Sequence, residues 1–471
     1  MKLPIITSVF TVLLIGSMQI SALAQDKQPV TMTLSLKQAQ EYALKNNTGV
    51  KNALLDIEIA KKKIWETKAI GLPQVSASGT YTHLFNVPSV NFGGTVISDH
   101  RVVSTIPGKS TVAAVPTGVP GDSIFQNPYD ALIKLGVPDN ATGNLNVSQL
   151  IFSGEYIVGL QATKVFLQIS QNSLQSASID LQESVANSYY LVLLMEQNKV
   201  ILSKSLANIT KTLSDMKEMN KQGFIENTDI DQLELTLNTL ENGIRAVENQ
   251  IAASYDLLKF QIGLPYENSL VLTDNLDKVI NDADVTSLLA KKFQVQSQIN
   301  FKIMENQEDA GVLNLKRQKS AYLPTLAAFY KHTENAKKSD FDFTMKDMAG
   351  LSLNVPIFSS GQRKVMVDQR VLELEKIRNS KTNVAMGLEL DFINSRNSFN
   401  SAYDQFVNEK TNITLTSRIY DKTLIKYKEG ISSSMDLTNA QNQYLTAQKN
   451  YFTALYTLLG SKNKLEKLLN N

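Results

Sequence analysis

Four segments of the chain, about 74–83, 143–152, 324–332 and 348–357, are predicted to be β-strands. In three of them polar residues alternate with apolar or small residues, so each strand would have one polar and one apolar face. The main candidates for the apolar faces are Val75, Tyr81, Leu145, Val147, Leu351, Leu353 and Val355. In 324–332 four consecutive residues, 327–330, are apolar, so the faces of this strand are not assigned.

Strands of this kind fit two environments. A tilted strand of about 9 to 11 residues can present one face to lipid and the other to water. A soluble antiparallel sheet packed on a helix has the same alternation, so the strands alone leave both open. Four strands do not close a barrel, and an open sheet edge is not tolerated in hydrocarbon. A membrane role therefore predicts that several copies join in one barrel, and two or three copies both satisfy closed symmetry.

Two long tracts, 154–263 and 361–470, have the spacing of helices. Neither contains proline, and their apolar residues recur mostly at intervals of three, four or seven. One glycine, Gly223 or Gly430, divides each tract, so each is predicted to be a hairpin of two long helices. Helices of this length pack along one another, and the spacing is that of a coiled-coil seam. The longest apolar run after Gln25, 189–195, is too short for a membrane helix of about 20 residues.

The two tracts belong to an internal repeat. Gly154 and Gly361, Gly223 and Gly430, and Asp229 and Asp436 are each separated by 207 residues. The predicted first repeat covers 25–263, with a helix, two strands around a proline-rich loop at 86–140, and the hairpin at 154–263. A linker at 264–283 follows, and the second repeat covers 284–471, with a helix, two strands and the hairpin at 361–470.

Residues 1–24 are predicted to be a signal peptide. Lys2 precedes an apolar stretch, and small residues at Ala22 and Ala24 suit cleavage before Gln25. The alternative is a membrane anchor that is retained.

Composition and charge exclude several classes of function. The 47 Lys and Arg residues balance the 45 Asp and Glu residues, whereas nucleic-acid binders carry a basic excess, so no nucleic-acid partner is expected. The chain has no Cys, which excludes disulfides and thiolate chemistry. Its three histidines, His83, His100 and His332, lack metal-binding spacing, and no nucleotide loop or nucleophile elbow is present. We therefore expect no enzyme activity, no cofactor and no metal site.

Several short motifs occur in order and in duplicate. They are the entry segment 34–39, the corners Leu72-Pro73 and Leu323-Pro324, the strand ends 150–154 and 355–361, and the turns 223–229 and 430–436. In these motifs the chain resembles the TolC-like outer membrane efflux proteins over essentially all of its length after residue 24. The resemblance implies a mainly α fold with a small β part and two structural repeats. Long antiparallel coiled-coil helices would form a periplasmic tunnel, and four transmembrane strands per chain would complete a twelve-stranded barrel in a homotrimer.

The resemblance also implies a function and a location. The trimer would be the outer membrane channel of a tripartite efflux pump or a type I secretion system, a passive exit duct for drugs, small molecules or polypeptides. Its partners would be other copies of the chain, a periplasmic adaptor, an inner-membrane pump and outer membrane lipid, with the helical part in the periplasm. The alternatives are a soluble periplasmic coiled-coil adaptor or structural protein, and a secreted enzyme with a helical stalk.

In this family the helical hairpins end at a periplasmic aperture that also docks the adaptor. The matching residues are Gly223, Asp229, Gly430, Ser432, Asp436 and Asn439. Asn439 replaces a second acid and Ser432 replaces a basic link partner, so a weak cation filter is expected and the latch is not identified. The alternative role of Asp229 and Asp436 is helix capping, because an acid in the first helical turn accepts free amide protons.

Overall fold

The computed structural model describes residues 30–87, 89–91, 96–98, 101–103, 132–134, 137–276, 285–337 and 344–469. The predicted signal peptide and most of the proline-rich loop lie outside them. The fold is mainly helical with a smaller antiparallel β part, which confirms the expected class. The chain divides into two compact units. One contains the described parts of 1–51, 178–293 and 392–470, and the other those of 52–177 and 294–391. None of the described helices has the length and apolarity that a membrane crossing requires.

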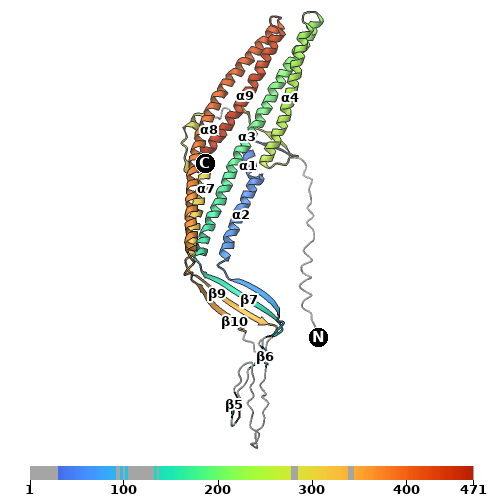
Figure 1. Ribbon diagram of the computed structural model, residues 1–471. Helices are drawn as coiled ribbons and strands as arrows, with labels where there is room; N and C mark the ends of the chain where they lie inside the picture. Colours follow the sequence, from blue (N-terminus) through green and yellow to red (C-terminus); the bar gives the residue numbers. More distant parts are fainter. Residues whose placement is uncertain are drawn as a thin grey trace, which may run out of the picture. The chain divides into compact units, whose positions relative to one another are not determined.

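Four long helices form two antiparallel hairpins (Figure 1). They are α3 Gly154–Lys221, α4 Asn227–Ile262, α8 Gln362–Lys428 and α9 Ser434–Leu469. The end of α8 and both ends of α9 each lie 207 residues after the matching end in the first hairpin. Proline-free sequence allows these lengths, and apolar seams hold the helices together.

The first unit contains the hairpin ends and a small layer around their middle. That layer consists of β1 Thr31–Leu34, which pairs in parallel with β8 Ser269–Leu272, and of α1 Leu36–Asn46 and α6 Val285–Ala290. Its core joins α1, α3, α4, α8 and α9. Tyr189, fully buried there, donates its hydroxyl to the Leu34 carbonyl at 3.0 Å and accepts the Asp274 amide at 3.3 Å.

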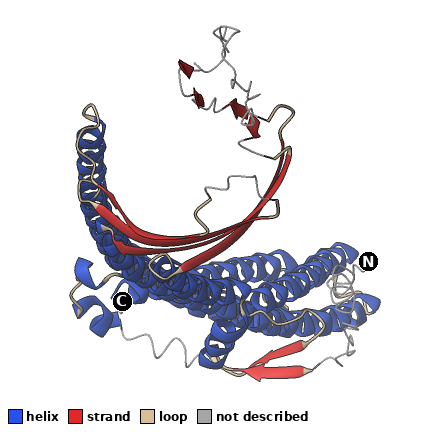
Figure 2. Ribbon diagram, turned by 90° about the horizontal axis from the view of Figure 1, so that it is seen from below, coloured by secondary structure: helices blue, strands red, loops and turns tan. Residues whose placement is uncertain are grey.

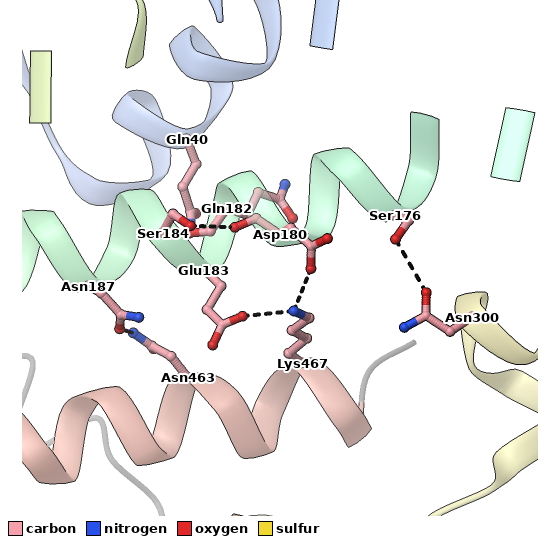
Figure 3. Close-up of polar contacts among 10 residues, drawn as sticks. All are labelled: Gln40, Ser176, Asp180, Gln182, Glu183, Ser184, Asn187, Asn300, Asn463 and Lys467. Atoms are coloured by element: carbon pink, nitrogen blue, oxygen red, sulfur yellow. Dashed lines mark hydrogen bonds and ion pairs between the residues drawn. The ribbon is translucent and has the colours of Figure 1, made fainter. Parts of the chain in front are cut away.

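Polar contacts fasten α9 to α3 in this unit (Figure 3). The Lys467 ammonium lies between the carboxylates of Asp180 and Glu183, at 2.9 Å from Glu183 Oε2. One turn away the Asn463 amide donates to Asn187 Oδ1 at 2.9 Å. These contacts fix the position of the C-terminal part of α9 along α3.

The second unit contains a four-stranded antiparallel sheet with the order β10-β9-β7-β2. With it lie α2 Thr48–Ala69, which begins in the first unit, the short helix Val295–Ser297, α7 Ile299–Ser320 and the first parts of α3 and α8. The strands are β2 Gln74–His83, β7 Asp139–Phe152, β9 Thr325–Asn335 and β10 Asp347–Asn354. Two short pairs follow β2 in the chain, namely β3 Ser89–Asn91 with β6 Leu132–Lys134 and β4 Val96–Ser98 with β5 Arg101–Val103.

The observed strand ends differ from the predicted ends by three or four residues at three places, and one of them is the end of β9, which lies at Asn335 and not at 332. β10 ends at Asn354, so the prediction of a strand to 357 was wrong, and Val355 lies outside the strand. Pro356 explains this end, because proline has no N–H to donate to a neighbouring strand. β7 begins at Asp139, four residues earlier than predicted, because it pairs with the full length of β2.

The pairing register assigns every strand residue to one of two faces of this sheet, which bends into an arc (Figure 2). Directly paired residues share a face, so one face carries the apolar candidates Val75, Tyr81, Leu145, Val147, Leu351 and Leu353. In β9, Leu326, Ala328 and Tyr330 lie on the same face. Phe329 lies on the opposite, polar face above Gly350, where an added Cβ would come within 2.8 Å of its ring.

Candidate functional site

The two hairpin tips have the same backbone geometry. At the end of α3 the amides of Gly223 and Phe224 donate to Asn220 and Met219, at 2.8 and 3.1 Å. At the end of α8 those of Gly430 and Ile431 donate to Tyr427 and Lys426, at 3.0 and 2.8 Å. This pair of backbone hydrogen bonds is the Schellman motif, which needs a residue in the left-handed conformation. Gly223 and Gly430 are in that conformation, with φ values of 81° and 71°.

Asp436 caps α9. Its carboxylate accepts the Ser433 amide at 3.0 Å and the Ser433 hydroxyl at 2.7 Å, and the Ser433 oxygen accepts the Asp436 amide at 3.1 Å. This reciprocal pair is a capping box. The Ser433 hydrogen bonds lower the pKa of Asp436, because they favour its charged form. The structure therefore shows the capping role of Asp436, which is compatible with a position at the aperture, and Ser432 belongs to the same cap, at 3.3 Å from Asp436 Oδ2.

Asp229, the matching acid of the first hairpin, makes a different contact. The residue at the N-cap of α4 is Glu226, and its side chain makes no capping hydrogen bond. The Asp229 carboxylate instead accepts the hydroxyl of Ser434, the first residue of α9. This bond connects the two hairpins, so the equivalent acids of the two halves have different roles.

Tyr427 lies beside this contact, near the end of α8. Its hydroxyl is buried and has no hydrogen-bond partner among the described residues. Burial, and then the charge of Asp229, raise the pKa of Tyr427 to about 12.

Buried polar groups continue into the helices behind the tips. The tips are held by an apolar cluster of Ile209, Leu213, Met216, Leu233, Leu240, Tyr420 and Leu437 from all four helices. Next to it lies Gln441, which is 1% exposed, and within the described part of the chain neither its amide nitrogen nor its amide oxygen has a partner. The narrow space around Gln441 has no room for a water molecule.

Of the other predicted residues, Asn439 is exposed on α9 after the cap. The structure therefore joins Asp436 with Ser432 and Asp229 with Ser434, and it leaves Gly223 and Gly430 as turn residues. Ser434 was missed by the sequence analysis, because its partner lies 205 residues away and no local pattern marks it. His100 lies outside the described residues. Within the described residues, no three His, Asp, Glu or Cys side chains converge as a metal site.

Known proteins share both the sequence and the fold of this chain. Residues 299–471 match the family model "Outer membrane efflux protein". The toluene efflux pump outer membrane protein TtgF of Pseudomonas putida is 23% identical over 368 residues, which are 75% of this chain and 71% of TtgF. The outer membrane protein TolC of Vibrio cholerae is 19% identical over 337 residues, which are 70% of this chain and 77% of TolC.

Solved structures cover nearly the whole chain. CusC superposes with a TM-score of 0.69 at 14% identity, over 95% of both chains. VceC of Vibrio cholerae superposes with a TM-score of 0.65 at 13% identity, over 93% of this chain and 96% of VceC. The chain is thus similar in sequence and in fold to the TolC-like outer membrane efflux proteins.

This similarity indicates the location and the general role of the chain. It is an outer membrane channel protein with a helical part in the periplasm, and it is not an enzyme. The resemblance identified from the short duplicated motifs is thereby confirmed.

Proposed function

We propose that three copies of the chain form a passive exit duct across the outer membrane, with a twelve-stranded barrel continued by a helical tunnel. The observation that supports this most directly is the sheet of the second unit. Its end strands, β2 and β10, each have a strand on one side only among the described residues. One of its faces is apolar and exposed, with Val75 at 67%, Leu351 at 69% and Leu353 at 64% exposure.

The strand directions favour closure between copies. β2 and β10 run in opposite directions, because three antiparallel pairs separate them. β2 of one copy can therefore pair with β10 of the next in the same antiparallel manner. Such pairing removes both free edges, which hydrocarbon does not tolerate, and the apolar faces then form a continuous outer band.

The helical part fits a tunnel built from two structural repeats per chain. The constant offset of 207 residues between matching hairpin ends supports the view that both hairpins are copies of one repeated sequence. Exposed apolar residues on α8 recur at heptad spacing, at Val365, Leu372, Met386, Ile393 and Val407. A stripe of this kind is the contact surface that neighbouring helices of another copy would cover.

The hairpin tips would be the periplasmic aperture and the docking site of the adaptor. Here the Asp229 to Ser434 hydrogen bond would hold the hairpins of one copy together, and Asp436 and Asn439 would face the aperture. Only Asp436 would contribute charge, so the aperture would be a weak cation filter. Replacement of Asp436 by Asn would then reduce block of the pore by divalent cations in planar bilayers.

The channel would work with a periplasmic adaptor and an inner-membrane pump. Efflux is favoured over polypeptide secretion, because two of the curated relatives, TtgF and SepC, are described as outer membrane proteins of efflux pumps. A soluble adaptor would have no use for an exposed apolar sheet face of this extent.

Engineered disulfides test the closed barrel, because the natural chain has no cysteine. Ala77 and Leu351 lie on the apolar face of β2 and β10, respectively. Oxidation of the Ala77→Cys, Leu351→Cys variant, or of Ala77→Cys, Leu353→Cys, should give a covalent trimer in denaturing gels. The control pair Ala77→Cys, Ser352→Cys has its side chains on opposite faces and should not cross-link. A detergent-independent monomer that forms no cross-link would contradict the proposal.

A further inference from the structure

A cluster of polar side chains lies at the end of β2 farthest from the helices. The Tyr81 hydroxyl donates to Asp139 Oδ1 at 2.9 Å, and His83 Nδ1 lies 2.7 Å from the same oxygen. Lys337 Nζ is 3.8 Å from the other oxygen of Asp139. Tyr81, His83 and Asp139 all lie on the apolar face, at its outer rim.

The same cluster occurs again on β9 and β10. The Tyr330 hydroxyl donates to Asp347 Oδ1 at 2.6 Å, and His332 Nδ1 lies 2.7 Å from that oxygen. Both clusters have a tyrosine and a histidine two residues apart on one strand and an aspartate on its neighbour. Asp347 Oδ2 makes no hydrogen bond or ion pair within the described part of the chain.

In each cluster the carboxylate orients the imidazole. An ionised carboxylate only accepts, so Nδ1 of the neutral ring carries the proton and Nε2 keeps its lone pair. Both histidines remain accessible, with side chains 46% and 41% exposed. A histidine held by a carboxylate in this way is the usual form of a metal-binding histidine in proteins.

One chain does not bring these groups together. His332 pairs with Leu145 on β7, whereas His83 pairs with Asp139, six residues farther along the same strand. Each cluster therefore offers one imidazole and one carboxylate, which is too few for a zinc site.

A second copy would bring the two clusters side by side. His83 is on β2 and Asp347 is on β10, the two strands that meet between copies if the barrel closes as proposed. Residues paired across the seam between β2 of one copy and β10 of the next lie on the same face of the sheet. A shift of one strand by a single residue would pair opposite faces, so only shifts by two residues are allowed. If the ends of β2 and β10 nearest the helices are level, Asp347 of one copy lies opposite Tyr81 of the other. If the two strands are shifted by two residues, Asp347 lies opposite His83. In both registers it is a direct or diagonal neighbour of His83, within side-chain reach.

We infer that each seam between copies binds one divalent transition-metal ion, of the zinc type, through Nε2 of His83 of one copy and through Nδ1 of His332 and the carboxylate of Asp347 of the next, where the ion takes the place of the proton that these two groups share at 2.7 Å. Imidazole and carboxylate groups are the ligands that such ions accept. Asp139 and the tyrosines would orient the ligands, and Lys337 already neutralises Asp139. The inference rests on the proposed oligomer, because the site is complete only at its seam.

The test uses the untagged full-length oligomer in detergent, with Zn²⁺ as the probe. Isothermal titration and elemental analysis should find about one ion per chain, and Zn²⁺ should raise the temperature at which the oligomer dissociates in denaturing gels. His83→Ala and His332→Ala should each lower Zn²⁺ affinity more than about tenfold and remove the stabilisation. The controls His100→Ala and Lys331→Ala should bind as the natural protein does.

Mixed oligomers show whether the ligands come from different copies. When His83→Ala and His332→Ala chains are coexpressed, some seams contain a natural His83 and a natural His332, so binding should be partly restored. Oligomers that bind no Zn²⁺, or bind it equally after both histidines are replaced, would overturn the inference and leave the barrel proposal standing. A chain that forms no closed oligomer would overturn both, and the disulfide experiment detects that case independently.

Discussion

The hydroxyl of Ser434 donates a hydrogen bond to the carboxylate of Asp229, across 205 residues of sequence. Ser434 opens α9 and Asp229 lies in the first turn of α4, so the bond joins the N-terminal ends of two helices from different hairpins. Both positions follow a glycine turn, and the turns set where each helix starts. The contact therefore depends on the equal geometry of the two tips.

Loss of this bond should loosen the tips. Ser434→Ala removes the donor and should reduce the local stability of the α9 N-terminus by about 1 kcal/mol. Hydrogen exchange of the first turns of α4 and α9 should then be roughly fivefold faster, because local opening requires less free energy. The control is Asp231→Ala, which removes an exposed carboxylate of α4, the helix that contains Asp229. Equal exchange in both variants would exclude a role of the bond in holding the tips.

The cap of α9 should depend on pH. The pKa of Asp436 is lowered in the folded protein. The ionised carboxylate therefore contributes fully to the stability of the cap when the pH is above the unfolded pKa of 3.8. This contribution is lost as pH falls below that value through the folded pKa. Exchange of the first turn of α9, normalised to that of α4, should rise over this acid range in the natural protein. In Asp436→Asn it should be fast already at neutral pH, and a pH-independent ratio in the natural protein would contradict this.

Ser433 tests the other half of the capping box. Ser433→Ala should cost about 1 kcal/mol of helix stability, the usual loss for an N-cap serine. The matched control is Glu226→Ala, because the Glu226 side chain at the N-cap of α4 accepts the Thr228 hydroxyl at 3.2 Å but makes no capping hydrogen bond to the helix backbone. Denaturant unfolding in detergent should separate the two variants.

Two buried glutamines of α9 should respond in opposite ways to the same replacement. Gln441 and Gln448 are both 1% exposed. Among the described residues neither amide atom of Gln441 has a partner, whereas the amide nitrogen of Gln448 donates to Asn198 Oδ1 at 2.9 Å and its amide oxygen has no partner. Gln441→Leu removes an unsatisfied amide and should stabilise the helices by about 1 kcal/mol. Gln448→Leu leaves Asn198 unpaired and should destabilise them by about 1 to 3 kcal/mol. Equal effects on thermal unfolding would show that Gln441 has a partner after all.

The two faces of β10 should tolerate charge differently. Leu351 and Ser352 are neighbours in the strand and face opposite sides of the sheet. If the apolar face contacts lipid, Leu351→Arg should cost about 2 to 4 kcal/mol near the bilayer midplane and reduce the yield of assembled oligomer. Ser352→Arg would face the barrel interior and should assemble normally. The readout is the oligomer yield in isolated outer membranes.

Two glycines of α3 should show the difference between packing and helix propensity. A Cβ added to Gly154 would lie 2.7 Å from Leu323 Cδ1 and 2.9 Å from Ser320 Cβ, whereas at Gly159 nothing lies within 4 Å. Gly154→Ala should therefore destabilise the corner between β7 and α3. Gly159→Ala should stabilise the helix by up to about 1 kcal/mol, since alanine is the better helix former. Thermal unfolding of both variants measures the contrast.

Much of the fold was predictable because the governing patterns are local. Alternation with period two located β2, and proline-free heptad-like spacing with Gly223 and Gly430 located the four long helices. The faces of β9 were not predictable, because Ala327, Ala328, Phe329 and Tyr330 give no alternation. Gly350 on the neighbouring strand leaves room for the Phe329 ring, and that information lies in the pairing register.

The candidate site was predictable only in part. The cap formed by Asp436 involves residues within one turn, so the sequence could offer capping as an alternative role, although it did not identify the partner Ser433. The bond from Ser434 to Asp229 and the Tyr-His-Asp clusters combine residues from separate strands or helices, and periodicity carries no information on such contacts.

The amino-acid sequence by itself determined the element types, the tip turns and the resemblance to the TolC-like proteins, because backbone preferences and short motifs act over a few residues. Only the tertiary structure decided the strand order β10-β9-β7-β2, the two faces of the sheet and the different roles of Asp229 and Asp436. These features depend on which distant segments pack together and in which register. Register is fixed by the fit of many side chains at once, and no single local pattern specifies it.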